Sequence, residues 1–278
     1  MSDRTALVLG GGGITGIAWE IGILHGLAEH GVDLTDADVV VGTSAGSVVG
    51  SQITSGLPLE ELYAEQLAPA DSEIGGAFSR SGALRLVIPY VLPGSGRDKL
   101  RRVGSLAMKS HAPGSADREG VIRSRLPVHA WPDRDLRVTA VEAETGRFTV
   151  FDRDSDVDLV SAVAASCAVP TVWPPVSVGE RHYVDGGMRS TANVDLVAGA
   201  DRVVVLAPLP RSFSRKSSIR AQLEKVAPRE WSVVAPDAEA LAAFGKNLLD
   251  PARRADAARA GVRQAQGLVA EMRHVWAG

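Results

Sequence analysis

The sequence contains a single cysteine, Cys167, among its 278 residues, which excludes an intramolecular disulfide. Its cysteine and histidine residues do not cluster at the spacing of a zinc site. A chain without disulfides suits a reducing compartment, so we expect a cytoplasmic protein. The first residues lack the basic segment, apolar core and cleavage site of a secretion signal. We therefore expect no export through that route.

Long apolar runs and a strong net charge are also missing. No run reaches the roughly eighteen apolar residues that a membrane-spanning helix needs, which leaves peripheral contact as the form of membrane association still open. The formal net charge of −3 offers no broad positive field, so we expect no nucleic-acid partner. With 45% hydrophobic residues the chain can bury a substantial core. The oligomeric state is not indicated.

Two strand-to-helix units open the chain. Residues 6–9 form a short apolar run before four glycines, and apolar positions then recur at helical spacing over residues 17–27. Residues 39–41 are β-branched and precede a second glycine-bounded turn, which leads into the apolar-rich segment 48–53. Parallel strands need crossover connections of this kind. We therefore predict a three-layer α/β/α fold with a mainly parallel central sheet.

The remaining elements are predicted from the same patterns. Residues 69–132 are rich in glycine, serine, proline and scattered charge, and we expect a variable, lid-like insertion there. Further predictions are strands at 136–141 and 148–151, a helix at 157–165, a hairpin from 176–178 and 182–184, a last core strand at 203–206, and one long surface helix over 251–276.

Residues 42–46 read Gly-Thr-Ser-Ala-Gly and fit the pattern G-x-S-x-G. In this pattern the flanking Gly42 and Gly46 permit a sharp strand-to-helix turn that projects the hydroxyl of Ser44 above the sheet edge. The following helix would direct backbone N–H groups toward developing negative charge. A glycine-bounded turn capped by a serine is the alternative. The position after a β-branched run favours a nucleophile.

Residues 10–16 read Gly-Gly-Gly-Gly-Ile-Thr-Gly between a predicted strand and a predicted helix. A dinucleotide loop has this spacing, but its ribose-binding acid belongs after the second strand, whereas Asp36 and Asp38 precede that strand. No Gly-Lys-Ser/Thr follows, which excludes a P-loop. Successive glycine N–H groups could instead form an oxyanion hole. A purely structural turn remains an alternative, although it would need fewer glycines.

A carboxylate ends the second arm of the predicted hairpin, at Asp185-Gly186-Gly187. Alone, this tripeptide is typical of a turn. In the company of a serine nucleophile, Asp185 could act as the general base if burial raises its pKa. A Ser-His-Asp triad is not favoured, because His274 lies in the polar tail and strand alternation places His182 on the face opposite Asp185.

Together these segments resemble the patatin-like phospholipases, a family of acyl hydrolases that use a Ser-Asp dyad. The resemblance spans residues 5–206 and includes Ala-Ser-Cys-Ala-Val-Pro at 165–170, Trp-Pro-Pro at 173–175, and Asn193. Residues 207–278 are expected to form a helical extension packed on the same domain.

The resemblance implies a mechanism and a set of site residues. Ser44 would attack a lipid or other acyl-ester substrate, Asp185 would accept its proton, and an acyl-enzyme would form. No metal or organic cofactor is implied. The implied oxyanion donors are Gly11, Gly12 and Gly13, and the other motif glycines are Gly16, Gly42, Gly46, Gly186 and Gly187.

One position departs from the family pattern. The family usually carries arginine or lysine before the last glycine of its oxyanion segment, and here that residue is Thr15. The missing charge puts strong binding of a phosphate head group in doubt. It leaves two other functions open: a short-chain esterase or thioesterase, and a weakly active lipid-binding regulatory protein.

An apolar run at residues 84–92 precedes the basic residues Arg97, Lys99, Arg101 and Arg102. It could anchor the protein in a lipid interface beside anionic head groups. Its short length and the interruption at Pro89 favour a core segment instead. We interpret Cys167 as a packed thiol, since no neighbouring residue in the sequence would lower its pKa.

Overall fold

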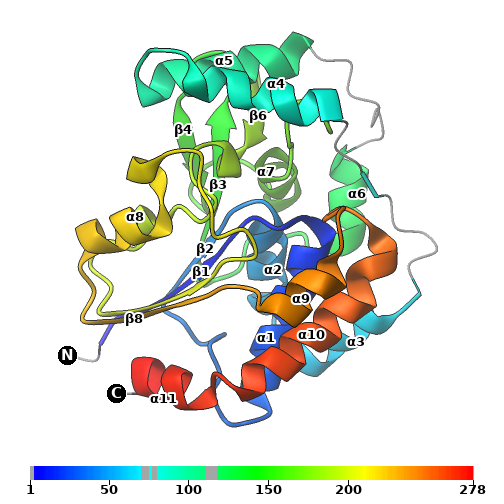
Figure 1. The fold of residues 1–278 in the computed structure, drawn as a ribbon, viewed down its shortest axis with the longest axis vertical. Helices are drawn as coiled ribbons and strands as arrows, with labels where there is room; N and C mark the ends of the chain where they lie inside the picture. Colours follow the sequence, from blue (N-terminus) through cyan, green and yellow to red (C-terminus); the bar gives the residue numbers. More distant parts are fainter. Residues whose placement is uncertain (1–2, 70–74, 77–79, 110–117, 278) are drawn as a thin grey trace.

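A single sheet forms the middle of the computed structural model, which describes residues 3–69, 75–76, 80–109 and 118–277 (Figure 1). The strand order is β5-β6-β3-β2-β1-β7-β8, and β4 pairs with β3 off this path. The strands are β1 (Thr5–Leu9), β2 (Val39–Gly42), β3 (Asp135–Glu142), β4 (Phe148–Phe151), β5 (Val176–Val178), β6 (Arg181–Asp185), β7 (Arg202–Leu206) and β8 (Glu230–Val234).

The pairing directions bring separate loops to one edge. Strands β1, β2, β3, β7 and β8 run parallel, which confirms the mainly parallel sheet, so the loops after β1 and β2 meet at the carboxyl edge. Strand β6 runs antiparallel to β3 and reaches this edge from the opposite direction. In the register Val138 faces Gly42, and Ala140, two residues on, faces Asp185. The topology therefore delivers Asp185 to the level of the turn after β2.

Both faces of the sheet are covered, as the three-layer prediction requires. Alternation along β1 sends Leu7 and Leu9 into a core with α1 (Gly13–Ala28), α2 (Ala45–Ile53), α7 (Leu159–Ser166) and α10 (Arg254–Gln266). Ala6 and Val8 point the other way, into a smaller core with η2 (Val194–Val197) and α8 (Ile219–Val226).

The tail differs from the single long surface helix that the sequence predicts. It consists of η4 (Pro251–Arg253), α10 and α11 (Val269–Ala277), with Gly267 between the last two. Helix α10 packs closely on α1. The contact leaves no room for a side chain at Gly22, where a Cβ atom would lie 2.2 Å from the carbonyl oxygen of Ala258. The contact face of α10 is largely alanine and glycine, a composition that gives little hydrophobic periodicity.

A second difference lies in the expected helical extension, which also contributes a strand. Strand β8 pairs in parallel with β7 at the edge of the sheet, so 203–206 is not the last strand. Helix α9 (Ala238–Phe244) follows it. Trp231, the second residue of β8, is half exposed, and Ser232 separates it from the apolar Val233 and Val234, so the five-residue strand gives only a short signal in the sequence.

The predicted insertion at 69–132 contains α4 (Arg80–Val91), α5 (Gly96–Lys109) and α6 (Arg118–Arg125), after α3 (Leu59–Leu67). Parts of it, at 70–74, 77–79 and 110–117, lie outside the described residues. Helices α4 and α5 pack over β3 and β6 through Leu86 and Leu100 (Figure 1). The favoured core interpretation of residues 84–92 is wrong for one face of α4, where the exposed side chains are Val87, Ile88, Val91 and, just after it, Leu92.

Candidate active site

The predicted site residues converge at the carboxyl edge of the sheet. One cavity of about 680 Å³ is lined by Gly11, Gly12, Gly13, Ser44, Asp185 and Gly187, together with largely apolar side chains. The remaining motif glycines do not line it: Gly16 lies in α1, Gly42 and Gly46 flank the serine, and Gly186 follows the aspartate. Residues far apart in the sequence therefore share a single cavity.

Ser44 occupies a strained turn between β2 and α2. Its φ of 54° and ψ of −117° are unusual for a residue with a side chain, and the surrounding contacts must hold it there. Its N–H donates to Ser166 Oγ at 2.9 Å, and its carbonyl accepts from Ser47 Oγ at 2.6 Å. The side chain of Ser44 is 9% exposed and lines the cavity. This is the geometry of a nucleophile elbow.

The flanking glycines make this turn sterically possible. A Cβ atom at Gly46 would lie 2.1 Å from the carbonyl oxygen of Leu9, and one at Gly42 would lie 2.5 Å from Cα of Ser47. Both clashes are with backbone, which side-chain rotation cannot relieve. The prediction that these glycines are steric necessities is confirmed.

Asp185 is 2% exposed and ends β6 beside the serine turn. Burial raises the pKa of its carboxyl group to about 6, against the opposing effects of a hydrogen bond with Ser44, the N–H of Gly187 and the charge of Arg118. The Gly187 N–H donates to Asp185 Oδ1 at 2.7 Å. A carboxyl group with this pKa can accept a proton near neutral pH and release it again.

The glycine loop divides the implied oxyanion donors. The N–H of Gly11 donates to the carbonyl of Thr191 at 2.8 Å and is therefore not free to bind an oxyanion. The N–H groups of Gly12 and Gly13 make no hydrogen bond within the described part of the chain. Gly13 has a φ of 64° and opens α1, whose positive end faces the cavity. Of the three implied donors, Gly12 and Gly13 thus keep an N–H group without a partner among the described residues.

A buried acid that the sequence patterns do not reveal forms a hydrogen bond with the start of this loop. Glu20 is fully buried, and its Oε1 accepts the N–H of Gly10 at 3.0 Å. Burial raises the pKa of the Glu20 carboxyl group well above its usual range. A single acid within an otherwise apolar helical segment was the available signal.

Thr15 is not among the residues that line the cavity. Its side chain is fully buried, and its hydroxyl donates to the carbonyl of Leu248 at 3.4 Å. The segment after α9 therefore covers the position where the family usually carries a cation. A different cation lines the cavity instead: Arg118, in the first turn of α6, which no sequence motif marks.

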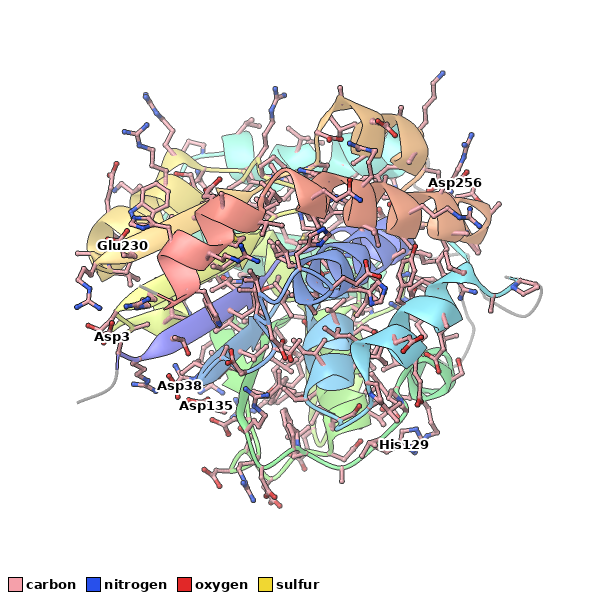
Figure 2. All side chains as sticks on the ribbon, turned by 90° about the horizontal axis from the view of Figure 1, so that it is seen from below. Asp3, Asp38, His129, Asp135, Glu230 and Asp256 are labelled. Carbon is pink, nitrogen blue, oxygen red and sulfur yellow. The ribbon has the colours of Figure 1, made fainter. Side chains whose placement is uncertain are left out.

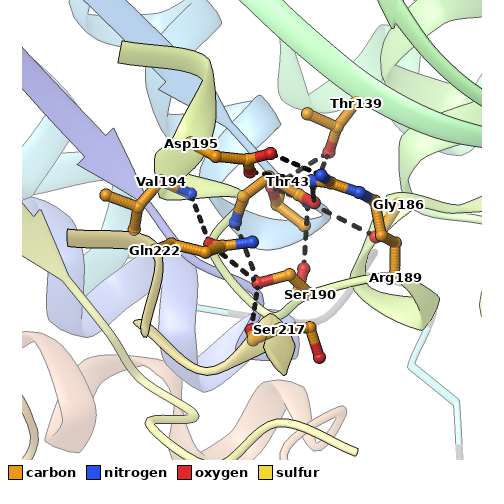
Figure 3. A network of polar contacts seen from close by, with 10 residues as sticks. Thr43, Thr139, Gly186, Arg189, Ser190, Val194, Asp195, Ser217 and Gln222 are labelled. Atoms are coloured by element: carbon orange, nitrogen blue, oxygen red, sulfur yellow. Dashed lines mark hydrogen bonds and ion pairs between the residues drawn. The ribbon is translucent and has the colours of Figure 1, made fainter. Parts of the chain in front are cut away.

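The polar network in Figure 3 joins the turn after β2, at Thr43, to the segment after β6, at Gly186 and Arg189. Asn193 has a left-handed φ of 53°, and its Nδ2 donates to Thr43 Oγ1 at 3.1 Å and to the carbonyl of Ser190 at 2.9 Å. Its Oδ1 accepts from Arg189 at 2.8 Å. Since Thr43 precedes the serine and Arg189 follows the Asp-Gly-Gly segment, Asn193 ties both halves of the site together.

The competing interpretations lose their key residues. His182 pairs with Glu144 at 2.6 Å on the surface, and no histidine of the described chain lines the cavity. Asp38 accepts the N–H of Thr5 at the amino edge of the sheet, so it cannot bind a ribose at the glycine loop. Cys167 is a buried thiol whose pKa is raised by burial, and its Sγ donates to the carbonyl of Ser44 at 3.2 Å.

The fold and this constellation define a family of known proteins. A family model described as patatin-like phospholipase matches residues 7–198. Because that match covers more than half of the chain, the chain belongs to the patatin-like phospholipase family.

Known relatives agree with this family. The chain is 28% identical over 209 residues to the uncharacterized NTE family protein Rv2565 of Mycobacterium tuberculosis, covering 74% of this chain and 30% of the relative. It is 27% identical over 207 residues to Rv1063c of the same organism, covering 74% and 49%. The chain thus spans less than half the length of these relatives. The crystal structure of VipD from Legionella pneumophila has the same fold, with a TM-score of 0.50, 14% identity, and coverage of 98% of this chain and 67% of that one.

Proposed function

We propose that this chain hydrolyses carboxylic ester bonds of lipids through a dyad of Ser44 and Asp185. The observation that carries the proposal is the placement of a strained serine beside a buried carboxyl group with a pKa of about 6, at one cavity. A base with that pKa is partly in its proton-accepting form at neutral pH and still has appreciable proton affinity. Membership of the patatin-like phospholipase family supports the same activity.

The proposed reaction proceeds in two halves. Asp185 accepts the hydroxyl proton of Ser44 while Oγ bonds to the ester carbonyl carbon, and the N–H groups of Gly12 and Gly13 stabilise the oxyanion. The tetrahedral intermediate collapses, the alcohol leaves with the proton from Asp185, and an acyl-enzyme remains. Asp185 then takes a proton from water, which attacks the acyl-enzyme. Release of the fatty acid returns the proton to Ser44.

The cavity wall supports a lipid acyl chain as the substrate. Its apolar lining includes Ile14, Ile17, Trp173 and Met188, which would exclude water from the bound acyl chain. The neutral Thr15 favours a second candidate, an esterase or thioesterase for short acyl groups. Rates on nitrophenyl esters of increasing chain length separate the two, since a short-chain enzyme loses activity beyond a few carbons.

We also propose peripheral contact with a membrane on the cytoplasmic side. Among the described residues, the helices are too short or too polar to cross a bilayer. Val87, Ile88 and Val91 expose an apolar face of α4 near the cavity residue Leu86. Sedimentation with vesicles tests the contact, and binding that is unchanged in Ile88→Glu would contradict it.

The proposed reaction is tested with Ser44→Ala and Asp185→Asn on nitrophenyl esters and a fluorogenic phospholipid. We expect each substitution to lower kcat by about 1,000-fold or more, because the two residues act as one unit. The surface variant His182→Ala is the matched control and should keep the wild-type rate. Retained activity in Asp185→Asn would place the base elsewhere. A wild-type protein that is inert on every ester would favour the lipid-binding regulatory protein.

A further inference from the structure

A buried arginine with unfilled donors stands in the wall of the cavity. Arg118 is 8% exposed, and its guanidinium lies 4.4 Å from the ring centre of Trp173. One nitrogen, Nη2, donates to the carbonyl of Cys167 at 3.1 Å. The other two, Nε and Nη1, are buried and make no hydrogen bond within the described residues. Unpaired buried donors on a cation are costly, which points to a ligand that completes them.

No carboxylate in the cavity wall is available to pair with Arg118. Among the described lining residues, the carboxylate is Asp185. That carboxylate already accepts the N–H of Gly187 and interacts with Ser44. Arg118 forms no ion pair with a carboxylate of the described chain. Within the described part of the chain, the Arg118 guanidinium therefore lines the cavity without a carboxylate partner.

We propose that Arg118 is an oxyanion-binding subsite of the ester site, and that the preferred ester carries a phosphate or carboxylate group near the scissile bond. This inference rests on the proposed function. A guanidinium is the side chain best suited to such oxyanions, because it stays charged when buried and directs several N–H groups. Arg118 would thus supply, from α6, the positive charge that Thr15 does not supply from the glycine loop.

A purely positional role is the competing explanation. Through Cys167, whose Sγ donates to the carbonyl of Ser44, Arg118 contacts the nucleophile turn, and its charge lowers the pKa of Asp185. A positional role would affect every ester alike, whereas a subsite affects anionic esters selectively. The ratio of two kcat/KM values therefore distinguishes the roles.

Two matched pairs of soluble esters measure that ratio on either side of the scissile bond. The alcohol-side pair is dihexanoylphosphatidylglycerol and dihexanoylglycerol, which differ in the phosphodiester. The acyl-side pair is the nitrophenyl monoester of adipic acid and nitrophenyl hexanoate, which differ in the carboxylate. In Arg118→Met we expect the anionic-to-neutral ratio of kcat/KM to fall about 10- to 100-fold in one pair, the size of a lost charge-assisted hydrogen bond.

Two further variants complete the test. Arg118→Lys keeps the charge and should retain more of the ratio than Arg118→Met does. Arg123→Met removes an exposed arginine from the same helix and should leave both ratios at the wild-type value. The pair that responds identifies the source of the oxyanion. Equal losses on both members of each pair, or ratios that do not change, would overturn the subsite.

A binding measurement separates failure of the subsite from failure of the proposed function. Calorimetric titration of Ser44→Ala with dihexanoylphosphatidylglycerol and with adipic acid monohexyl ester needs no turnover. If the wild type hydrolyses no ester but adding Arg118→Met weakens either binding about tenfold, the subsite stands and the hydrolase proposal fails. If adding Arg118→Met weakens neither, the subsite is wrong whatever the activity.

Discussion

The two edges of the sheet handle charge in opposite ways. At the amino edge, acidic residues precede or begin the parallel strands and lie on the surface, as Figure 2 shows for Asp3, Asp38, Asp135 and Glu230. They are paired locally: Asp3 with Arg202 and Arg229, Asp135 with Arg137, and Glu230 with His274. Solvent screens exposed pairs of this kind, so each contributes little to stability.

At the carboxyl edge, three charged groups in and beside the cavity are buried. Asp185, Glu20 and Arg118 are all less than 9% exposed. Burial raises the pKa of the two carboxyl groups and lowers the pKa of the guanidinium, so it favours the neutral form of each group. The amino edge therefore stabilises the fold with solvated charges. The cavity at the carboxyl edge holds desolvated groups, whose burial costs stability and is typical of a functional site.

The largest expected effect comes from adding one methyl group at the carboxyl edge. Gly46→Ala would place Cβ 2.1 Å from the carbonyl oxygen of Leu9, so either β1 or the turn must move. We expect a loss of about 3 kcal/mol or more in the free energy of unfolding, measured by urea denaturation. The control is Gly96→Ala at the exposed start of α5, where a Cβ meets no atom within 4 Å. Similar losses in both variants would contradict the steric argument.

Gly46 also illustrates which parts of the site can be predicted from the sequence. Gly42, Gly46 and the loop glycines are required by local backbone geometry, and such requirements leave a readable motif around Ser44. The short core strands β1, β2 and β7 were predictable for a similar reason, since they are continuous apolar runs.

The misses depend on contacts between distant segments. Gly11 loses its role as a donor because Thr191, 180 residues later, accepts its N–H. Thr15 is covered by Leu248, and Arg118 reaches the cavity from a stretch without periodicity. Strand β8 and the alanine face of α10 are defined by the neighbours they pack on. No spacing rule carries that information.

Asn193 tests whether the network behind the site is structural. Asn193→Ala removes the amide that binds Thr43 and Ser190, and places alanine at a φ of 53°. We expect unfolding to become about 2–4 kcal/mol easier, from unsatisfied partners and the left-handed backbone together. Asn193→Gly relieves only the backbone part and should recover about 1 kcal/mol of it. Equal stability of the two variants would show that the left-handed backbone at residue 193 does not contribute to the loss.

The pH dependence of Asp185 links activity to instability. Below pH 6 the base is increasingly protonated, so kcat/KM should fall about tenfold per pH unit and be level above pH 7. The folded-state pKa of about 6 exceeds the ordinary value of 3.8, so the folded state binds this proton more tightly. Its stabilising contribution is therefore full below pH 4 and is lost as the pH rises through 6, by about 3 kcal/mol at most.

Asp185→Asn separates this contribution from the rest of the protein. The amide does not ionise, so the variant lacks this pH dependence. Its stability relative to the wild type should therefore increase as the pH rises from 4 to 7, although the variant is expected to be inactive. Denaturation curves of both proteins at each pH measure the difference. A constant difference across that range would show that Asp185 keeps an ordinary pKa.

The smallest expected effect lies at the amino edge, where Asp38→Ala removes an exposed carboxylate. Asp38 Oδ2 accepts the N–H of Thr5 at 2.8 Å and its hydroxyl at 3.0 Å, which fastens the start of β1 to β2. Solvent screens these bonds, so the loss of stability should be about 1 kcal/mol or less. The kcat/KM on any ester should equal the wild-type value, because this residue and Ser44 lie at opposite ends of β2. A variant with normal stability but reduced kcat/KM would show that charge at the amino edge reaches the site, and the division between the two edges would no longer hold.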